Sequence, residues 1–261
     1  MPKPLALVRP PAPSFVNAVS SHPLRDTIDY DRALEQHADY VAALREAGAE
    51  VRLLEPLDAF PDSTFIEDNA VILEGRAFLC SMQEPSRRGE PALLQPVLEE
   101  LLPVEIIQPP AFVDGGDVLW TDYGIYIGHS KRTNPQAREF LAARTAARLL
   151  PVPVRNFLHL KSVATYLGSG WLVINKRGCN YMPFALFNWI EVDREEAEGA
   201  NTLALGRTVI MPAGQDSLAK RIELAGFRVR PVDISEFQKA DGGVTCLSLI
   251  IPRQPPGGGS A

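Results

Sequence analysis

The chain has 261 residues, of which 46% are hydrophobic and 22% charged, and its formal net charge is -6 at pH 7. A chain of this length can bury a sizeable core. An acidic balance does not favour nucleic acid or an anionic membrane as a partner, although it allows a small cationic substrate. No stretch approaches the roughly 18 consecutive apolar residues of a membrane-spanning helix. We therefore expect a globular protein that binds neither nucleic acid nor membrane.

The two ends of the chain and its cysteines indicate the cellular compartment and the extent of the folded domain. The first residues, 1–5, lack the apolar core of a secretion signal. Three cysteines are too few for a disulfide framework and match no zinc-binding spacing: Cys80, Cys179 and Cys246. We expect a cytoplasmic protein with one catalytic domain over residues 1–252. Residues 253–261, rich in glycine and proline, are expected to form a flexible tail.

Periodicity and turn residues predict alternating strands and helices. In chain order these are strand Leu5–Val8, a proline-rich loop through His22, helix Tyr30–Ala47, strand Glu50–Leu54, strand pair Phe65–Leu73 and Ala77–Ser81, helix Pro91–Leu101, strand Val104–Ile107, strand pair Asp117–Trp120 and Ile125–Ile127, helix Pro135–Ala147, strands Leu149–Pro153, Trp171–Ile174, Asn201–Leu205 and Thr208–Met211, helix Asp216–Ala225, and strands Phe227–Val232 and Thr245–Ile251. Repetition of strand pair, helix and strand predicts an α/β fold other than a simple doubly wound sheet.

Two segments of the sequence resemble each other. Residues 113–119 and residues 240–247 each contain an acid, two glycines and an apolar run. Repeats of about 40–50 residues indicate a radial or stacked architecture. We see no linker that would divide the chain into independent domains.

Cys246 follows the glycine-rich turn Asp241-Gly242-Gly243-Val244-Thr245 and begins an apolar run. Paired glycines let the backbone turn sharply or approach a ligand closely. A thiol held in such a place is a candidate nucleophile. From this segment alone, a buried structural cysteine is the favoured alternative.

His159 is the best candidate among four histidines for proton transfer near neutral pH. His37 falls on the core face of a predicted helix, and His22 lies in the proline-rich loop. From the segment around His159 alone, a hydrogen-bonded core histidine is the favoured interpretation.

Acidic residues gather in two segments: Asp62, Glu67 and Asp68, then Asp114 and Asp117. Carboxylates pair with a guanidinium group through two parallel hydrogen bonds. Solvated turn acids are an equally favoured alternative. A metal site is not expected, because no histidine stands at ligand spacing.

Two arginines, Arg87 and Arg132, each stand shortly before a predicted helix. An arginine near a helix start can clamp a carboxylate. Solvation at the surface is the favoured alternative for either one alone.

Eight segments, in order over nearly the whole chain, resemble the dimethylarginine dimethylaminohydrolases of the amidinotransferase superfamily. Any one of them is weak, but together they outweigh the separate alternatives. They are 33–37, 61–68, 85–90, 114–119, 130–134, 158–162, 209–214 and 241–246. The resemblance implies a five-bladed α/β propeller with pseudo-fivefold ββαβ repeats. It also implies hydrolysis of asymmetric dimethylarginine or monomethylarginine to citrulline and an amine through a covalent cysteine intermediate, without a cofactor.

The resemblance also assigns roles at the reacting end of the substrate. Cys246 would be the nucleophile and His159 the general acid and base, with Asp114 as the residue that orients the imidazole. Asp68, assisted by Glu67, would hold the guanidinium group.

Further roles concern the amino-acid end of the substrate. Asp62 would pair with the α-ammonium group, helped by the backbone near Ala240 and Asp241. Arg87 and Arg132 would bind the α-carboxylate group.

Two other functions remain open from the sequence. Arginine deiminases share this chemistry but carry an aspartate two positions after the histidine, where this chain has Lys161. One carboxylate fewer leaves room for N-methyl groups, which donate no hydrogen bond. A non-catalytic binder of arginine derivatives would have no need of Cys246, His159 and Asp114.

Two segments depart from the family pattern. Residues Phe15–His22 fall where the family has a mobile lid. Residues Arg177–Ala200 match only loosely and are compatible with an altered pocket or a subunit contact. A homodimer is compatible with the sequence, which does not fix the oligomeric state.

Overall fold

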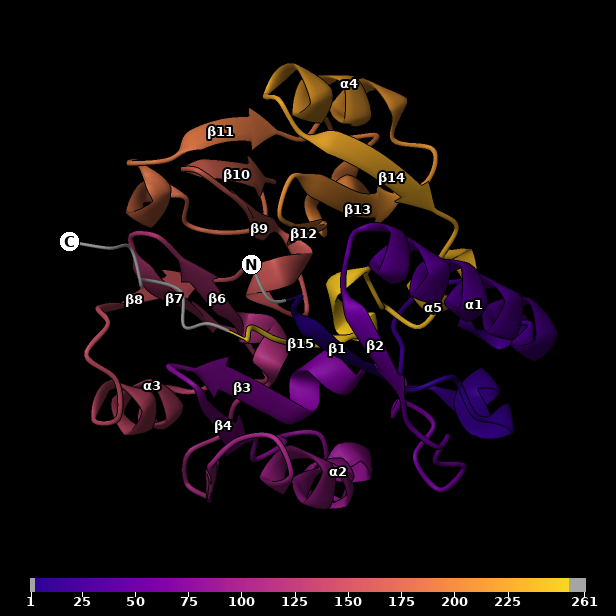
Figure 1. The fold of residues 1–261 in the computed structure, drawn as a ribbon, viewed down its shortest axis with the longest axis vertical. Helices are drawn as coiled ribbons and strands as arrows, with labels where there is room; N and C mark the ends of the chain where they lie inside the picture. The colour runs from indigo at the N-terminus through magenta and orange to yellow at the C-terminus, as the bar shows by residue number, and fades with distance from the viewer. Residues whose placement is uncertain (1–2, 254–261) are drawn as a thin grey trace.

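The computed structural model describes residues 3–253 and consists of five three-stranded sheets around a common centre (Figure 1). In every sheet the first strand pairs antiparallel with the second, and the second pairs parallel with the third. The sheets are β15-β1-β2, β3-β4-β5, β6-β7-β8, β9-β10-β11 and β12-β13-β14. The predicted five-bladed α/β propeller is thereby confirmed.

The bounds of the elements follow the predicted order closely. The strands are β1 Leu5–Val8, β2 Glu50–Leu53, β3 Ala70–Leu73, β4 Arg76–Leu79, β5 Val104–Ile106, β6 Val118–Thr121, β7 Gly124–His129, β8 Leu149–Pro153, β9 Ala164–Gly168, β10 Trp171–Ile174, β11 Asn188–Glu191, β12 Leu203–Leu205, β13 Thr208–Pro212, β14 Arg228–Val232 and β15 Leu249–Ile251. The helices are α1 Tyr30–Glu46, α2 Glu90–Glu99, α3 Pro135–Ala142, α4 Asp216–Leu224 and α5 Ser235–Gln238.

Each blade repeats one connection. Parallel neighbours need a crossover, and α1, α2, α3 and α4 provide it between the second and third strands of four blades. The fourth blade has only the 3-10 turn Met182–Phe184 in that place. The last strand, β15, joins the first blade beside β1, so the two ends of the described chain close the ring.

A 3-10 turn precedes the first strand of every blade. These five central turns are η3 Ile66–Asn69, η5 Gly115–Asp117, η6 Leu160–Ser162, η8 Ala197–Ala200 and η9 Thr245–Leu247. They recur about 40–50 residues apart, as expected from the resemblance between residues 113–119 and 240–247. Neighbouring turns touch: η9 contacts η3, η3 contacts η5, η5 contacts η6, and η6 contacts η8. Five parts of the sequence therefore meet at one place.

Several predicted bounds were wrong. The segments Phe65–Leu73 and Thr245–Ile251 are strands only in their second halves, because their first halves form η3 and η9. Apolar residues in these turns are buried from all sides, so no alternation distinguishes turn from strand. The helix predicted to reach Ala147 ends at Ala142. Strands β9 and β11 and the short helix α5 were not predicted.

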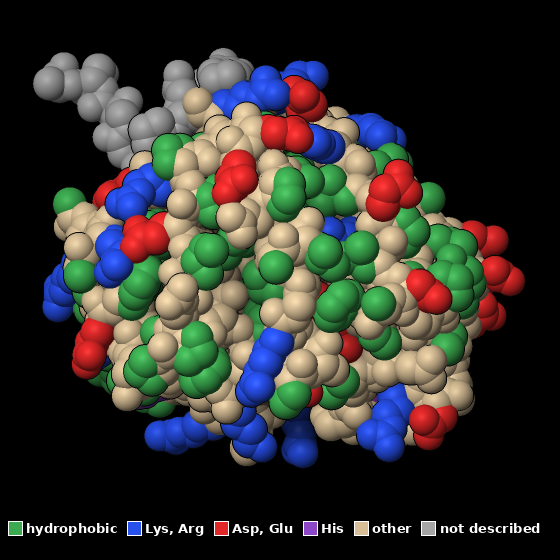
Figure 2. Space-filling model, turned by 90° about the horizontal axis from the view of Figure 1, so that it is seen from below, with side chains coloured by type: hydrophobic (Ala, Val, Ile, Leu, Met, Phe, Trp, Pro, Cys, Tyr) green, Lys and Arg blue, Asp and Glu red, His purple; other side chains and the backbone are tan. Residues whose placement is uncertain are grey.

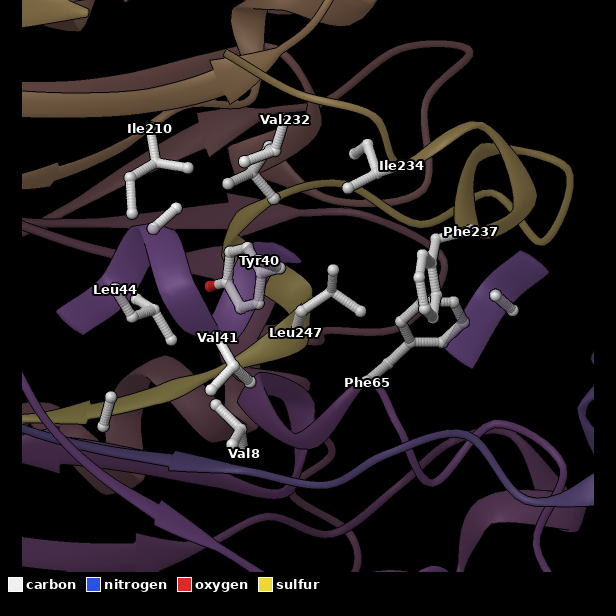
Figure 3. Packing of buried hydrophobic residues seen from close by; sticks show 14 of the residues in the cluster. Val8, Tyr40, Val41, Leu44, Phe65, Ile210, Val232, Ile234, Phe237 and Leu247 are labelled. Carbon is white, nitrogen blue, oxygen red and sulfur yellow. The ribbon is translucent and has the colours of Figure 1, made fainter. Parts of the chain in front are cut away.

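Helix α1 covers the turn that carries Cys246. Its residues Tyr40, Val41 and Leu44 face the core together with Leu247 of η9 (Figure 3). The Tyr40 hydroxyl and the Ser248 hydroxyl lie 2.7 Å apart and are hydrogen-bonded. Leu247 is fully buried, so the residue after Cys246 anchors this turn in the core.

The surface carries mixed charge. On the face shown in Figure 2, basic and acidic side chains are interspersed among hydrophobic ones. Among residues 3–253, no helix combines the length and the apolar character needed to cross a membrane. Apart from Arg253, the predicted tail lies outside the described residues.

Candidate active site

The central turns gather the residues singled out in the sequence. Glu67 and Asp68 belong to η3, and Cys246 belongs to η9. Asp114 immediately precedes η5, and His159 immediately precedes η6. These five residues come from four repeats, and the contacts between turns place them around the propeller centre.

His159 is held between two carboxylates. Its Nε2 lies 3.0 Å from Asp114 Oδ2, and its Nδ1 lies 3.9 Å from Asp68 Oδ1. Burial disfavours the charged imidazole, but the carboxylates of Asp68, Asp117 and Asp114 outweigh burial and raise the pKa of His159 to about 9. Asp117 also accepts a hydrogen bond from the Leu160 N–H at 2.8 Å, which fixes the turn after His159. At neutral pH the imidazole is therefore protonated and can act as an acid.

Asp68 is fully ionised at the centre of this cluster. It accepts hydrogen bonds from Arg87 Nη1 at 2.7 Å and from the Gly116 N–H at 3.1 Å. Burial opposes the charge, but His159 and Arg87 outweigh it and lower the pKa of Asp68 to about 2. An ionised carboxylate thus stands beside the imidazolium and is available to a cationic ligand.

Two glycines explain how the turns approach so closely. A Cβ atom on Gly116 would lie 2.8 Å from His159 Nδ1 and 2.9 Å from Asp68 Oδ1. A Cβ atom on Gly243 would lie 2.4 Å from Asn201 Cγ. All three distances are shorter than a Cβ atom tolerates, so any other residue at either position would push the central turns apart.

The Cys246 thiol is neutral in the free protein. Burial raises its pKa well above the usual range, and the Glu67 and Asp68 carboxylates raise it further. The Gly243 N–H points at the sulfur at 3.4 Å. Since two carboxylates oppose a thiolate, a cation bound between them and the sulfur would favour the thiolate.

Glu67 is already engaged on both oxygens. It accepts from Lys161 Nζ at 2.7 Å and from the Thr245 hydroxyl at 2.7 Å. Lys161 also donates to the Gly115 carbonyl at 3.1 Å. Sequence reasoning noticed Lys161 only as a missing aspartate and did not detect its ion pair. No local pattern could reveal it, because the partners are 94 residues apart.

The two arginines occupy different environments. Arg87 is buried and binds Asp68 together with Glu90, whose two oxygens accept from Nε at 3.0 Å and Nη2 at 2.9 Å. Sequence reasoning missed Glu90. Arg132 is less constrained: its Nη1 lies 3.5 Å from Asp114 Oδ2 and makes no hydrogen bond within the described chain. Arg132 is therefore the guanidinium with more free donor capacity.

Asp62 lies where a loop covers the site. We call residues 13–29, which contain the predicted lid Phe15–His22, the lid segment. The Val19 N–H lies 3.2 and 3.3 Å from the two Asp62 oxygens. Burial raises the pKa of Asp62 to about 6, although Arg87 and the Val19 N–H favour its charge.

The lid segment is hydrogen-bonded to the residues that precede the Cys246 turn. The Ser20 hydroxyl donates to the Lys239 carbonyl at 2.8 Å, and the Ser21 N–H donates to Asp241 Oδ2 at 2.7 Å. Ala240 is buried, whereas Asp241 is exposed with its carboxylate on the lid segment. A cavity of about 540 Å³ is bounded by Ser21 of the lid segment together with Asn201 and Gly243, among others.

Three ligand atoms of Asp68, Asp114 and His159 lie within 4.8 Å of one another. Such a group can in principle hold a metal ion. Here Arg87 already binds Asp68, and Asp114 occupies the His159 Nε2. The arrangement therefore fits proton transfer better than metal binding.

Comparisons with known proteins identify relatives of the whole chain. A family model described as "N,N dimethylarginine dimethylhydrolase, eukaryotic" matches residues 14–178. The N(G),N(G)-dimethylarginine dimethylaminohydrolase of Pseudomonas aeruginosa is 37% identical, over 93% of this chain and 97% of that protein. The protein of the same name from Streptomyces coelicolor is 36% identical, over 95% and 97%.

Solved structures agree. A cysteine-to-serine variant of the Pseudomonas aeruginosa enzyme, complexed with citrulline, superposes with a TM-score of 0.91 at 34% identity, over 96% of this chain and all of that one. The N-terminal domain of the cyanobacterial arginine dihydrolase ArgZ has a TM-score of 0.89 at 22% identity, over 96% and 98%, which shows a shared fold alone. With a matching family model and relatives above 30% identity over almost its full length, the chain belongs to the dimethylarginine dimethylaminohydrolase family.

Proposed function

We propose that this protein hydrolyses Nω-methylated arginine to citrulline and releases dimethylamine or methylamine. The observation that carries the proposal is the arrangement at the propeller centre. The Asp114–His159 pair and Cys246 both lie against the Glu67–Asp68 carboxylates. An acid and a nucleophile thus share one anionic site in a member of this family.

The anionic centre suits a guanidinium cation. Asp68 would receive two N–H groups of the substrate, while Glu67, bound to Lys161 and Thr245, contributes its charge. Asp62 would pair with the α-ammonium group beside Ala240 and Asp241. Entry of the cation would offset the carboxylates that raise the pKa of the thiol.

Arg132 and Arg87 would bind the α-carboxylate. Arg132 has the larger share in our proposal, because its Nη1 has no hydrogen-bond partner among the described residues. Arg87 already donates hydrogen bonds to Asp68 and Glu90. Its contribution to binding the α-carboxylate is therefore mainly electrostatic.

The first chemical step forms a bond between the Cys246 sulfur and the guanidinium carbon. When the substrate cation binds, the Cys246 thiol releases its proton to solvent, and the resulting thiolate attacks the guanidinium carbon, which becomes tetrahedral. The bond from carbon to the methylated nitrogen then breaks, and protonated His159 delivers a proton to that nitrogen, because an amide anion is too poor a leaving group. The amine departs and leaves an S-alkylthiouronium bound to Cys246.

The second step uses the same imidazole in the opposite sense. Neutral His159 removes a proton from water as the water oxygen attacks the thiouronium carbon. Collapse of this second tetrahedral species breaks the carbon–sulfur bond and releases citrulline. Asp114 holds the imidazole orientation through both steps.

Lys161 favours a methylated over an unmethylated substrate. It supplies a cation two residues after His159, and its ammonium group is bound to Glu67. An unmethylated guanidinium would bring extra N–H donors that find no additional carboxylate there. Methyl groups need no such acceptor.

Compartment and assembly belong to the same proposal. Cys80, Cys179 and Cys246 are all unpaired, as is usual in a reducing cytoplasm. For assembly we propose a homodimer. The segment Arg177–Ala200, which exposes Met182 and Leu186, would provide the subunit contact.

The test measures citrulline from asymmetric dimethylarginine, monomethylarginine and arginine, with the parent protein and Cys246→Ser. We expect product from the methylated substrates only, and none in the variant. Equilibrium binding of substrate to Cys246→Ser should persist. Turnover of arginine itself would make the protein a deiminase, and full activity in Cys246→Ser would contradict the mechanism.

A further inference from the structure

Asn201 lies behind the nucleophile without contacting the proposed substrate groups. It follows η8, and 5% of its surface is exposed. The side-chain oxygen accepts from the Thr245 N–H at 2.9 Å. The side-chain nitrogen donates to the Thr245 hydroxyl at 3.1 Å and to the Lys161 carbonyl at 3.0 Å. Since the oxygen meets a donor and the nitrogen meets two acceptors, these contacts fix the orientation of the amide.

These bonds hold the residue directly before Cys246. Thr245 is bound by Asn201 at its backbone nitrogen and at its hydroxyl. The Asn201 side chain also packs where a Cβ on Gly243 would stand, 2.4 Å from its Cγ. Asn201 therefore restrains the turn at Gly243, whose N–H points at the sulfur, and at Thr245.

The same amide completes a closed circuit of hydrogen bonds. The Thr245 hydroxyl donates a hydrogen bond to Glu67 Oε2 at 2.7 Å, and Lys161 Nζ donates to the other Glu67 oxygen at 2.7 Å. Asn201 joins Lys161 back to Thr245. The circuit links three central turns and the residue that follows η8. The position of the thiol and the orientation of Glu67 are consequently fixed together.

We propose that Asn201 is a positioning residue for the Cys246 nucleophile. It acts through Thr245 and Glu67, and it does not touch the reacting atoms. The inference rests on the proposed function, in which Cys246 is the nucleophile. A displacement of about 1 Å at a nucleophile can cost about 100-fold in rate, so the amide is expected to affect kcat more than KM.

The test compares Asn201→Leu and Asn201→Ala with the parent protein. Leu keeps most of the side-chain volume but none of the hydrogen bonds, and Ala removes both. We expect kcat to fall about 100-fold in each, with KM for asymmetric dimethylarginine changed by no more than about threefold. Alkylation of Cys246 by iodoacetamide, read on its own peptide by mass spectrometry, should become faster because the loosened turn exposes the sulfur.

Asn175→Ala is the matched control. Asn175 is also buried, at 2%, and its side chain accepts from the Arg177 N–H at 3.2 Å, away from Thr245. This variant should lose stability without a change in kcat or in alkylation of Cys246. Thr245→Ser and Thr245→Val test the hydrogen bond between Asn201 and Thr245 by changing Thr245 instead. They also test the proposal if the Asn201 variants do not fold. Ser should retain kcat, whereas Val should lower it.

The two proposals fail separately. If the parent protein turns over no methylarginine, the proposed function fails, and the alkylation rates still report on Asn201. If alkylation and kcat of the folded Asn201 variants match the parent, Asn201 is merely structural and the inference is overturned. Equal kcat in Thr245→Val and Thr245→Ser would overturn it as well.

Discussion

The central turns and the lid segment lie next to each other but are built in opposite ways. At the centre, buried charges find their partners in other repeats: Asp114 binds His159, and Asp68 binds Arg87. The lid segment is mostly exposed and is held by scattered hydrogen bonds, such as the two from Ser21 to Asp241, and by the buried ring of Phe15. The central turns hold charged side chains in a low-dielectric interior, and the lid segment lies over them.

This difference separates chemistry from access. Removing one partner of a buried ion pair leaves a charge without water or counter-ion, which is costly. Removing an exposed hydrogen bond leaves groups that water can satisfy. Changes at the centre should therefore affect kcat and folding, whereas changes in the lid segment should affect KM.

The largest effect is expected from Asp114→Asn. The change keeps the shape but removes the charge that faces His159 Nε2 at 3.0 Å. Loss of an orienting carboxylate lowers kcat by about 10³–10⁴-fold in comparable catalytic groups. One of the carboxylates that raise the pKa of His159 is also lost, so this pKa, about 9 in the parent protein, should fall.

Two measurements check this prediction. Single-turnover rates report the chemical step, and NMR titration of the imidazole reports the pKa. Thermal unfolding serves as a control that the variant is folded. A kcat within about tenfold of the parent, with an unchanged His159 pKa, would mean that Asp114 does not orient the catalytic imidazole.

The second prediction concerns stability. Glu90→Ala removes the carboxylate that binds Arg87 through two hydrogen bonds in the interior. The variant should lose about 3–5 kcal/mol of unfolding free energy. Asp241→Gly, which breaks the exposed contacts with Ser21 and fits the positive φ of 56° at this position, should lose about 1 kcal/mol or less from those contacts. Urea unfolding of both variants compares the two regions directly, and equal losses would contradict the distinction.

The sequence predicted the repeat and most strands, because apolar runs and turn residues are local signals. The strand bounds that were wrong belong to the central turns. The residues of η3 and η9 belong to short turns buried among other turns, where neither period two nor period 3.6 applies. The fold there is decided by contacts between repeats, which a local pattern does not contain.

The site shows the same limit. Cys246, His159 and Asp114 could be proposed from residue type and family resemblance. Glu90 and Asn201 could not, since each is an ordinary polar residue whose partners lie 3 to 44 residues away in the chain. Their role becomes visible only from burial and hydrogen bonding.

The third prediction uses Asp62, which lies between the two regions. Burial raises its pKa to about 6, so the carboxylate is ionised above pH 6 and becomes neutral below it. A neutral Asp62 cannot pair with the α-ammonium group. kcat/KM should therefore fall by about tenfold per pH unit below 6. Asp62→Asn should have a low kcat/KM over the whole pH range and should not show the fall below pH 6. If the variant still shows that fall, a group other than Asp62 is responsible for it.

The smallest effect is expected at the attachment of the lid segment. Asp241 has a positive φ of 56°, a conformation that Asn and Gly accept more readily than other residues. Asp241→Asn can still accept from the Ser21 N–H, whereas Asp241→Gly fits the backbone but removes the acceptor. Loss of exposed hydrogen bonds worth about 0.5–1.5 kcal/mol predicts a KM roughly two- to tenfold higher for Gly, with kcat unchanged and Asn close to the parent. Because Gly removes the contact without adding backbone strain, a fall in kcat with constant KM would show that the lid attachment takes part in the chemistry of the Cys246 turn.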